Sequence, residues 1–506
     1  MRRLPGATGP AASSPLLPTE ETTHVTTSRP RLIFAVLAVG AGVFTMLQSL
    51  VAPALPTIQH ELHASQSTTT WVMTAYLLSA SVCTPILGRV GDLAGKKRTL
   101  VAALAALAAG CLLAALAPGI GLLILARVVQ GAGGAVFPLA FGIIRDEFEP
   151  ARIPAAVGGF AAVLSLGSGL GVVLAGPVIS ALDHHWLFWL PATVVAATAL
   201  AAQLCIPESP GRAQGRVNWA AATLLAAGLV ALLLPISQAP SWGWASVGVL
   251  GLLAAAALLL TLWVLTEVRS AVPLIDMRIM RLPGVWTTNS AALAFGAGMF
   301  GIFSFLPQFA QVPREAGYGF GASVTEAGAL LLPMMITTFA LGIVSGRVQA
   351  RFSPRSQLLA ASLMCVLSCT ALAWRHDSRW QVGLAAAVFG AGVGLAFSAM
   401  TNLVVASVPP QQTGAAGGMN TNLRTVGGAI GAAVMSTVVT SDPRPDGLPR
   451  EAGFSHGFLV LALLCLVAVL AACLVPAGRR AAEAEDAGGE PGGRGAAPAA
   501  ASAHEG

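Results

Sequence analysis

Three polar side chains stand inside long apolar segments of the sequence. Gln48 lies in FTMLQSLVAPALP, Arg127 in RVVQGAGGA and Arg424 in GGMNTNLRTVGGAIG. A charge in the middle of a membrane-spanning helix costs roughly 2.5–3.5 kcal/mol even on insertion scales. Each arginine must therefore face protein or a wet cavity and find hydrogen-bonding partners there. Residues of this kind indicate a binding pocket for a polar solute at membrane depth.

Other polar residues accompany these three. Gln130 follows Arg127 by three residues and shares its helix face, while Asn420 and Asn422 precede Arg424. Gln48 can hydrogen-bond either a substrate or Arg127, and an unpaired amide facing lipid is unfavourable. The polar stretch around Arg424 either lines a cavity or forms the cytoplasmic end of a span.

Acidic residues are absent from the middle of every apolar segment. Asp92 and Glu326 lie near segment ends and are the best candidates for a group that carries a proton. Glu326 lies at the start of the segment 325–350. An acidic residue at a helix start is more commonly present because the helix dipole stabilises its charge. Both interpretations of Glu326 stay open.

The composition indicates a membrane protein. The 506 residues are 55% hydrophobic and 10% charged, whereas soluble domains carry about 25% charged residues. About fourteen apolar segments are long enough to cross a bilayer as helices. The seven cysteines lack metal-ligand spacing, and no Gly-Lys-Ser/Thr nucleotide loop or catalytic triad is present. We therefore expect no enzyme, no ATP-driven transport by this chain, no metal or cofactor and no nucleic-acid partner.

Charge asymmetry predicts the orientation. An even number of spans places both termini on one side of the membrane. Only a few of the 28 Lys and Arg residues fall in loops on the other side, namely Arg314, Arg375, Arg379, Arg444 and Arg450. The positive-inside rule then places both termini in the cytoplasm.

A weak internal repeat divides the chain. GRV at Gly88 recurs at Gly346, and the pair Gly159 and Gly169 recurs at Gly418 and Gly428. Both displacements are nearly equal and correspond to eight spans. They predict parallel six-helix halves. The expected units are a disordered cytoplasmic tail (1–30), an N-terminal six-helix bundle (31–206), two linking helices with cytoplasmic loops (207–284), a C-terminal six-helix bundle (285–476) and a second disordered tail (477–506).

The loop GRVGDLAGKKR resembles the signature loop between spans two and three of the major facilitator superfamily, and the whole chain resembles its fourteen-span drug:proton antiporter branch. The resemblance implies two six-helix bundles plus two linking helices. It also implies that Arg89 and Asp92 act in a cytoplasmic charge lock. Gly91 and Gly95 would provide the bend there, with Lys96 and Lys97 completing the motif.

Two further motifs carry the resemblance. RVVQGAGGA is similar to the fourth-span motif, whose arginine, here Arg127, the family ties to proton coupling. GSGLGVVLAG is similar to the span-five antiporter motif but departs from it at Val172 and Ala175. The glycines of this stretch are Gly167, Gly171 and Gly176, and Pro177 follows directly and can supply the bend in place of the missing proline. Generic small-residue helix packing explains that motif equally well.

Span one departs most from the family, because Gln48 stands where the family has an acid, and an amide cannot titrate. The resemblance implies a secondary transporter in the cell membrane. It would export drug-like molecules or metabolites by alternating access, with proton coupling, as a monomer. An uncoupled facilitator or importer and a ligand-binding sensor without flux are the alternatives. If Arg127 and Arg424 both stand in a central cavity without carboxylates, it suits neutral or anionic compounds.

Overall fold

The computed structural model describes residues 30–476 except 150–151, 209–215, 271–272, 350, 410–412, 443 and 446–447. The predicted tails, 1–30 and 477–506, lie outside the described residues apart from Pro30. The described part of the chain is helical and contains no β-strand. The long helices of the first half are α1 (Pro30–Glu61), α2 (Gln66–Ala94), α3 (Lys96–Ala115), α4 (Ile120–Gln130), α5 (Val136–Glu147), α6 (Ile153–Ala181) and α7 (Trp186–Cys205). Those that follow are α8 (Trp219–Trp242), α9 (Val247–Arg269), α11 (Pro283–Gln311), α13 (Leu332–Gln349), α14 (Pro354–Trp374), α15 (Arg379–Ser407), α16 (Thr413–Val439) and α17 (Glu451–Leu474).

Short elements complete two of the spans. The 3-10 helix η1 (Gly131–Ala135) joins α4 to α5, and α12 (Val324–Ala329) precedes α13. The remaining short elements are α10 (Met277–Met280) and η3 (Arg314–Ala316). The predicted spans are confirmed as helices, although several helices run further than predicted. The first reaches Glu61, because a helix can continue into the polar interface after its apolar stretch ends.

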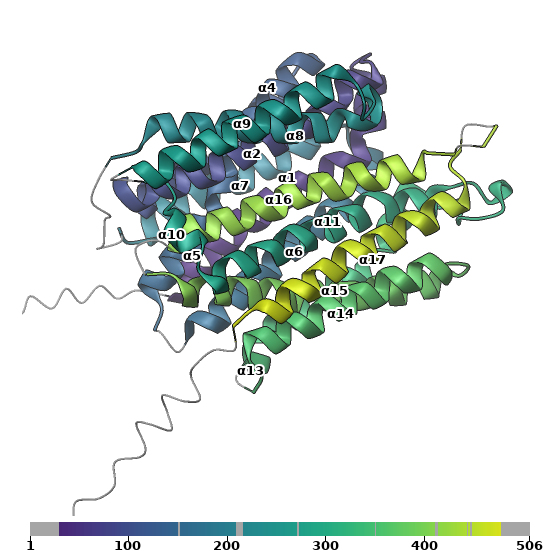
Figure 1. Ribbon diagram of the computed structural model, residues 1–506. Helices are drawn as coiled ribbons and strands as arrows, with labels where there is room; N and C mark the ends of the chain where they lie inside the picture. The colour runs from purple at the N-terminus through teal and green to yellow at the C-terminus, as the bar shows by residue number, and fades with distance from the viewer. Residues whose placement is uncertain are drawn as a thin grey trace, which may run out of the picture.

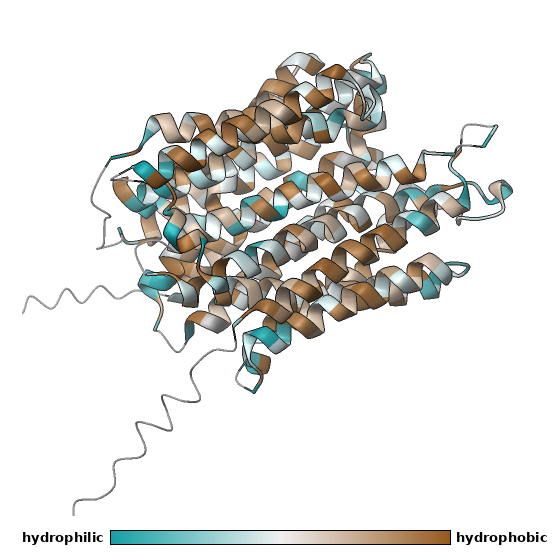
Figure 2. Cartoon of the chain, viewed as in Figure 1, coloured by the Kyte–Doolittle hydropathy of each residue, from teal (hydrophilic) through white to brown (hydrophobic). Residues whose placement is uncertain are grey.

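The long helices run side by side as one bundle (Figure 1). Hydrophilic residues gather at the two ends of the helices, and apolar residues cover their middles (Figure 2). Thirteen spans in the described residues are long and apolar enough to cross a membrane. Helix α16 is not among them, because Asn420, Asn422 and Arg424 lower its hydropathy, yet it runs through the bundle between α2 and α11.

Two large apolar cores lie in the two halves of the chain. One is built from buried residues between Ile33 and Ile206. The other is built almost wholly from residues between Ala291 and Val475. A third, smaller core joins α8 and α9 to α2 and α16. Helices α8 and α9 lie together at one edge of the bundle (Figure 1), with most of α9 exposed to the surroundings.

Candidate functional site

A cavity lies between the two halves of the chain. It encloses about 740 Å³ of atom-free space, counted to its open mouth. Helices α1, α2, α5 and α6 of the first half line it together with η1, and α11, α13, α15 and α16 line it from the second half. Ligand pockets in helical proteins lie preferentially between the helices of a bundle. The cavity is therefore the candidate binding site.

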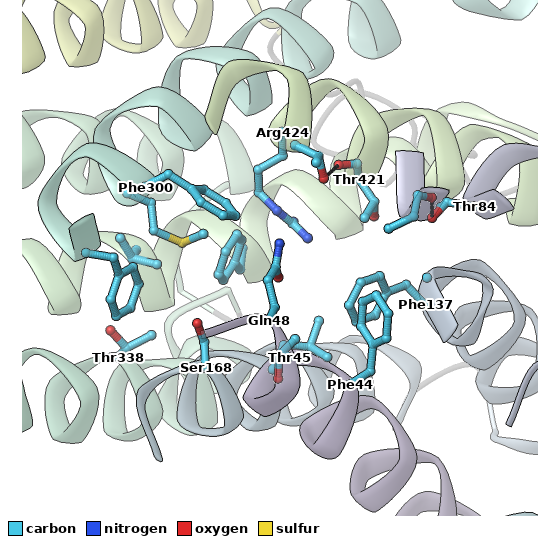
Figure 3. Close-up of a pocket in the computed structure, with 18 of the residues that line it drawn as sticks. Phe44, Thr45, Gln48, Thr84, Phe137, Ser168, Phe300, Thr338, Thr421 and Arg424 are labelled. Atoms are coloured by element: carbon cyan, nitrogen blue, oxygen red, sulfur yellow. Dashed lines mark hydrogen bonds between the residues drawn. The ribbon is translucent and has the colours of Figure 1, made fainter. Parts of the chain in front are cut away.

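Gln48 and Arg424 approach each other across this cavity. Gln48 projects from α1 and Arg424 from α16, and their side chains point toward one another (Figure 3). Both are partly buried, and within the described residues neither side chain has a hydrogen bond or an ion pair. The Arg424 guanidinium carbon lies 4.4 Å from the centroid of the Phe397 ring. Two sets of polar donors thus face the same space without protein partners.

Aromatic and thioether side chains form most of the remaining wall. Phe44 packs edge-to-face on Phe137 with ring centroids 5.2 Å apart. The apolar lining further includes Phe300, Phe303, Met299, Met334 and Met335. Small hydroxyl groups are interspersed among them, at Thr45, Thr84, Ser168, Thr338, Thr421 and Thr425. The cavity is mostly apolar, with few polar groups to orient a ligand.

Arg424 is the only charged side chain that lines this cavity, so none of the described carboxylates faces it. The sequence predicts that no span has an acid at its middle, and none of the described carboxylates neutralises Arg424 in the cavity. The electrostatic field in the cavity is therefore that of one cation, and it is strong where the local dielectric constant is low.

Arg127 does not line the cavity, so the two intramembrane arginines are not in one site. It is fully buried in the first half, where Nε donates to the Val72 carbonyl oxygen at 3.1 Å and Nη1 to that of Leu47 at 3.3 Å. Nη1 also donates to Gln130 Oε1 at 2.7 Å. The guanidinium stacks on the Tyr76 ring, 4.0 Å from its centroid. Gln48 is therefore not the partner of Arg127, because backbone carbonyls and Gln130 have taken that role.

The asparagines of α16 lie beside the cavity and not in it. Asn420 Nδ2 donates to Asn289 Oδ1 of α11 at 3.0 Å. Asn422 is buried, and its Oδ1 has no partner. A second, smaller cavity of about 310 Å³ adjoins Asn420 and shares Thr421 and Arg424 with the central one. This space extends the site toward the start of α16.

The charged loop between α2 and α3 forms a buried network. Lys96 Nζ lies 2.6 Å from Asp146 Oδ2 at the end of α5. Asp92 is buried near Lys96 and Arg89, yet Asp92 Oδ2 and Arg89 Nε have no hydrogen-bond partner among the described residues. Lys96 therefore pairs with Asp146 and not with Asp92, while Arg98 Nε lies 3.4 Å from Glu208 Oε2. Lys97 is partly buried and forms no ion pair in the described residues.

The two glycines of this loop have different structural roles. Gly95 adopts φ +117°, a conformation that favours glycine. It ends α2 and begins α3. A Cβ on Gly91 would overlap the Leu139 side chain of α5. Gly95 thus allows the bend, and Gly91 allows the close approach of α2 to α5.

Glu326 lies far from the cavity lining. Its carboxylate accepts from the Ser323 backbone N–H at 3.0 Å in a capping box at the start of α12. It also lies 3.5 Å from Arg379 Nη1. The structure thus gives Glu326 the geometry of a helix-start acid.

The span-five glycines face two neighbours. A Cβ on Gly167 or Gly171 would overlap the backbone of α1, whereas on Gly176 it would meet Thr325 at the start of α12. Pro177 is exposed. Gly167 and Gly171 therefore allow close packing within the first half, and Gly176 allows close packing between halves.

Most of the cavity lining escaped prediction from the sequence. Phenylalanines are common in membrane spans, and threonine hydroxyls satisfy themselves on their own helix, as Thr45 does with the Gly42 carbonyl oxygen at 2.9 Å. The one feature of the sequence that points to lining residues is their spacing of three or four positions from a polar residue on the same helix. Phe44 lies four residues before Gln48, and Thr421 three before Arg424.

Comparison with known proteins identifies relatives of similar length. A family model described as Major Facilitator Superfamily matches residues 37–432. The chain is 28% identical over 438 residues to the tetracenomycin C resistance and export protein of Streptomyces glaucescens, covering 83% of this chain and 80% of that protein. It is 29% identical over 464 residues to the puromycin resistance protein pur8 of Streptomyces alboniger, covering 86% and 89%.

A solved structure shares the fold. The human organic anion transporter MFSD10 (TETRAN) superposes with a TM-score of 0.64 at 16% identity, covering 88% of this chain and all of that one. At this identity the likeness concerns the fold alone. The predicted all-α fold of a polytopic membrane protein is confirmed.

Proposed function

Because the chain belongs to the Major Facilitator Superfamily, we propose that it exports small drug-like molecules or metabolites by alternating access, with coupling to protons. The family resemblance found in the sequence is confirmed. The family and the relatives are transporters, so the chain is a multi-pass membrane transporter and not an enzyme. The observation that carries the proposal is the cavity lined from both halves.

Alternating access requires two halves that can rock about a shared site. Small residues at the contact between α6 and α13 support such motion. A Cβ on Gly342 would overlap Ala162, and one on Gly169 would overlap Met335. Smooth surfaces of this kind let helices slide or tilt with little interlocking of side chains.

Export is the direction that the relatives support. The names of two relatives state resistance, to tetracenomycin C and to puromycin, and one of them also states export. We therefore propose that the substrates of the present chain are also drug-like molecules. We also propose that the protein is a monomer in the plasma membrane. The charge asymmetry supports the proposal that both termini lie in the cytoplasm.

Proton coupling needs a group outside the cavity, because none of the described carboxylates lines it. Asp92 is our choice over Glu326. It is buried beside Lys96 and Arg89, and Lys96 already holds Asp146 at 2.6 Å. A proton on Asp92 would change the balance of charge in this network and so the contact between α2 and α5.

Flux into inside-out vesicles tests the proposal. We expect uptake of tetracenomycin C to rise when the vesicle lumen is made acidic, and to lose this pH response in Asp92→Asn while downhill flux persists. Flux that follows only the substrate gradient in the unaltered protein would establish an uncoupled facilitator. Binding without flux would establish a sensor. Either result would contradict proton-coupled export.

A further inference from the structure

We propose that the cavity selects planar aromatic anions, held at the anionic group by Arg424 and Gln48 and at the rings by the phenylalanine wall. This inference rests on the proposed transport function and names its substrate class.

The first support is the state of Arg424. A buried charge normally has a paired charge or hydrogen-bond acceptors, because the loss of hydration is expensive. Arg127 in the same protein follows this rule with three acceptors. Arg424 has none among the described residues, and its guanidinium carbon lies 4.4 Å from the centroid of the Phe397 ring. The acceptor that Arg424 lacks is supplied when an anion occupies the cavity.

The packing of α16 holds this arginine in place. A Cβ on Gly296 would overlap the backbone of Arg424, and one on Gly427 would overlap the backbone of Leu293. Helices α11 and α16 therefore touch along their backbones at Arg424 and three residues after it. This close contact positions Arg424, and its guanidinium points into the open space (Figure 3). Such preorganisation favours binding, because little is lost on ordering the site.

Gln48 supplies a second donor on the opposite wall. Its amide offers two N–H groups, has no partner in the part of the chain that the structure describes, and points toward Arg424 (Figure 3). A carboxylate or sulfonate has several acceptor oxygens and could accept from both side chains at once. An acid at position 48 would instead neutralise Arg424 and remove the anion site.

The remaining wall selects the body of the ligand. Phe44, Phe137 and Phe397 present ring faces or edges close to the two donors. Aromatic pairs prefer stacked or edge-to-face contact, and Met299, Met334 and Met335 can adapt to ligand shape. The wall therefore favours flat rings attached to the anionic group over a small inorganic anion.

Three naphthalene probes of matched shape and one small anion test this inference by binding. They are naphthalene-2-sulfonate, its neutral sulfonamide, naphthalen-2-yl-trimethylammonium and methanesulfonate. Binding to the purified protein in nanodiscs is measured by fluorescence anisotropy of the naphthalene-2-sulfonate, directly or by displacement. We expect the aromatic sulfonate to bind at least about tenfold more tightly than the sulfonamide, because charge-assisted hydrogen bonds are about twice as strong as neutral ones. The ammonium and methanesulfonate should displace it weakly or not at all.

Variants assign the effect to the residues named. Arg424→Gln should weaken sulfonate binding at least about tenfold and leave sulfonamide binding within about twofold. Arg424→Lys should fall between, because it keeps the charge but loses the planar fork. A folded Arg424→Gln protein, shown by an unchanged size-exclusion profile, that binds the sulfonate as tightly as the original would overturn the inference. So would equal affinity for sulfonate and ammonium.

Flux separates this inference from the proposed function. Transport of puromycin without binding preference for the sulfonate would overturn the anion site and leave export intact. Arg424-dependent sulfonate binding without flux of any compound would support the anion site and contradict export.

Discussion

The two intramembrane arginines show how the surroundings of one residue type decide its role. Arg127 is 0% exposed and has backbone and side-chain acceptors on every side. Arg424 is partly buried, lines the cavity, lies over the Phe397 ring and has no hydrogen-bond acceptor among the described residues. We therefore assign Arg127 to the integrity of the first half and Arg424 to ligand binding.

Replacing Arg127 tests its structural role. Arg127→Met would leave the carbonyl oxygens of Leu47 and Val72 and the amide of Gln130 without their donor. We expect a loss of about 1–3 kcal/mol in stability for the unsatisfied groups, seen as a lower midpoint of thermal unfolding in detergent. Arg424→Gln is the matched control and should unfold near the original midpoint. An unchanged midpoint for Arg127→Met would refute the assignment.

Replacing Gln48 by an acid tests the electrostatics of the cavity. In Gln48→Glu the new carboxylate would face Arg424 and form an ion pair with it. We expect the variant to lose naphthalene-2-sulfonate binding at least about tenfold and to gain binding of naphthalen-2-yl-trimethylammonium. Gln48→Ala is the control, which should weaken sulfonate binding without admitting the cation. If Gln48→Glu binds the sulfonate as before, the two side chains do not act on one ligand group.

Helix α16 is the element on which the site depends most. Its polarity keeps it out of the set of thirteen spans that are apolar enough to cross a membrane. Close backbone contact with α11 at Gly296, Gly427 and Gly431 compensates by shielding one of its faces from lipid. The same contact sets the position of Arg424.

A methyl group at this contact should disturb both fold and site. Gly427→Ala would place a Cβ against the Leu293 backbone, so α16 must move from α11. We expect about 1–3 kcal/mol of destabilisation, as for other overpacked positions, together with weaker sulfonate binding. Gly248→Ala in α9, where nothing lies within 4 Å, is the control and should change neither. Thermal unfolding and anisotropy on the same samples measure both effects. Equal behaviour of the two variants would contradict the role given to the α11–α16 contact.

The sequence predicted elements better than side-chain directions. Runs of apolar residues bounded by charge or Pro and Gly predict membrane helices, because the bilayer demands a fixed apolar length. Both Arg127 and Arg424 lie in spans rich in glycine, and the sequence alone does not show which of them faces a cavity. That depends on the rotation of each helix within the bundle, which is set by packing between segments far apart in the chain. The condition that both arginines stand in one cavity is not met, because Arg127 does not line it.

At the scale of the whole molecule, the parity of the spans depends on α16. If α16 crosses the membrane, the chain has fourteen spans and both termini lie on one side. If it does not, the thirteen remaining spans place the termini on opposite sides. The polarity of one helix thus affects the topology of the entire protein.

Reporter fusions at both ends test this topology. We expect green fluorescent protein to fluoresce and alkaline phosphatase to be inactive at the N-terminus and the C-terminus alike, because both lie in the cytoplasm under the positive-inside rule. Fusions truncated after Ser407, before α16, provide the control and should also report the cytoplasm, whereas fusions after Val439 should report the other side. Opposite reports from the two full-length ends would contradict fourteen spans.

The central claim is that Gln48 and Arg424 face one water-reachable chamber between the halves, and cysteine labelling tests it most directly. Gln48→Cys and Arg424→Cys would be made in a chain whose native cysteines are replaced by alanine. A membrane-impermeant methanethiosulfonate would then be applied to vesicles of each orientation. The account predicts that both positions react, that naphthalene-2-sulfonate protects Gln48→Cys, which keeps Arg424, and that Leu47→Cys, fully buried beside Arg127, does not react. Labelling of neither position from either side, or equal labelling at Leu47, would contradict it.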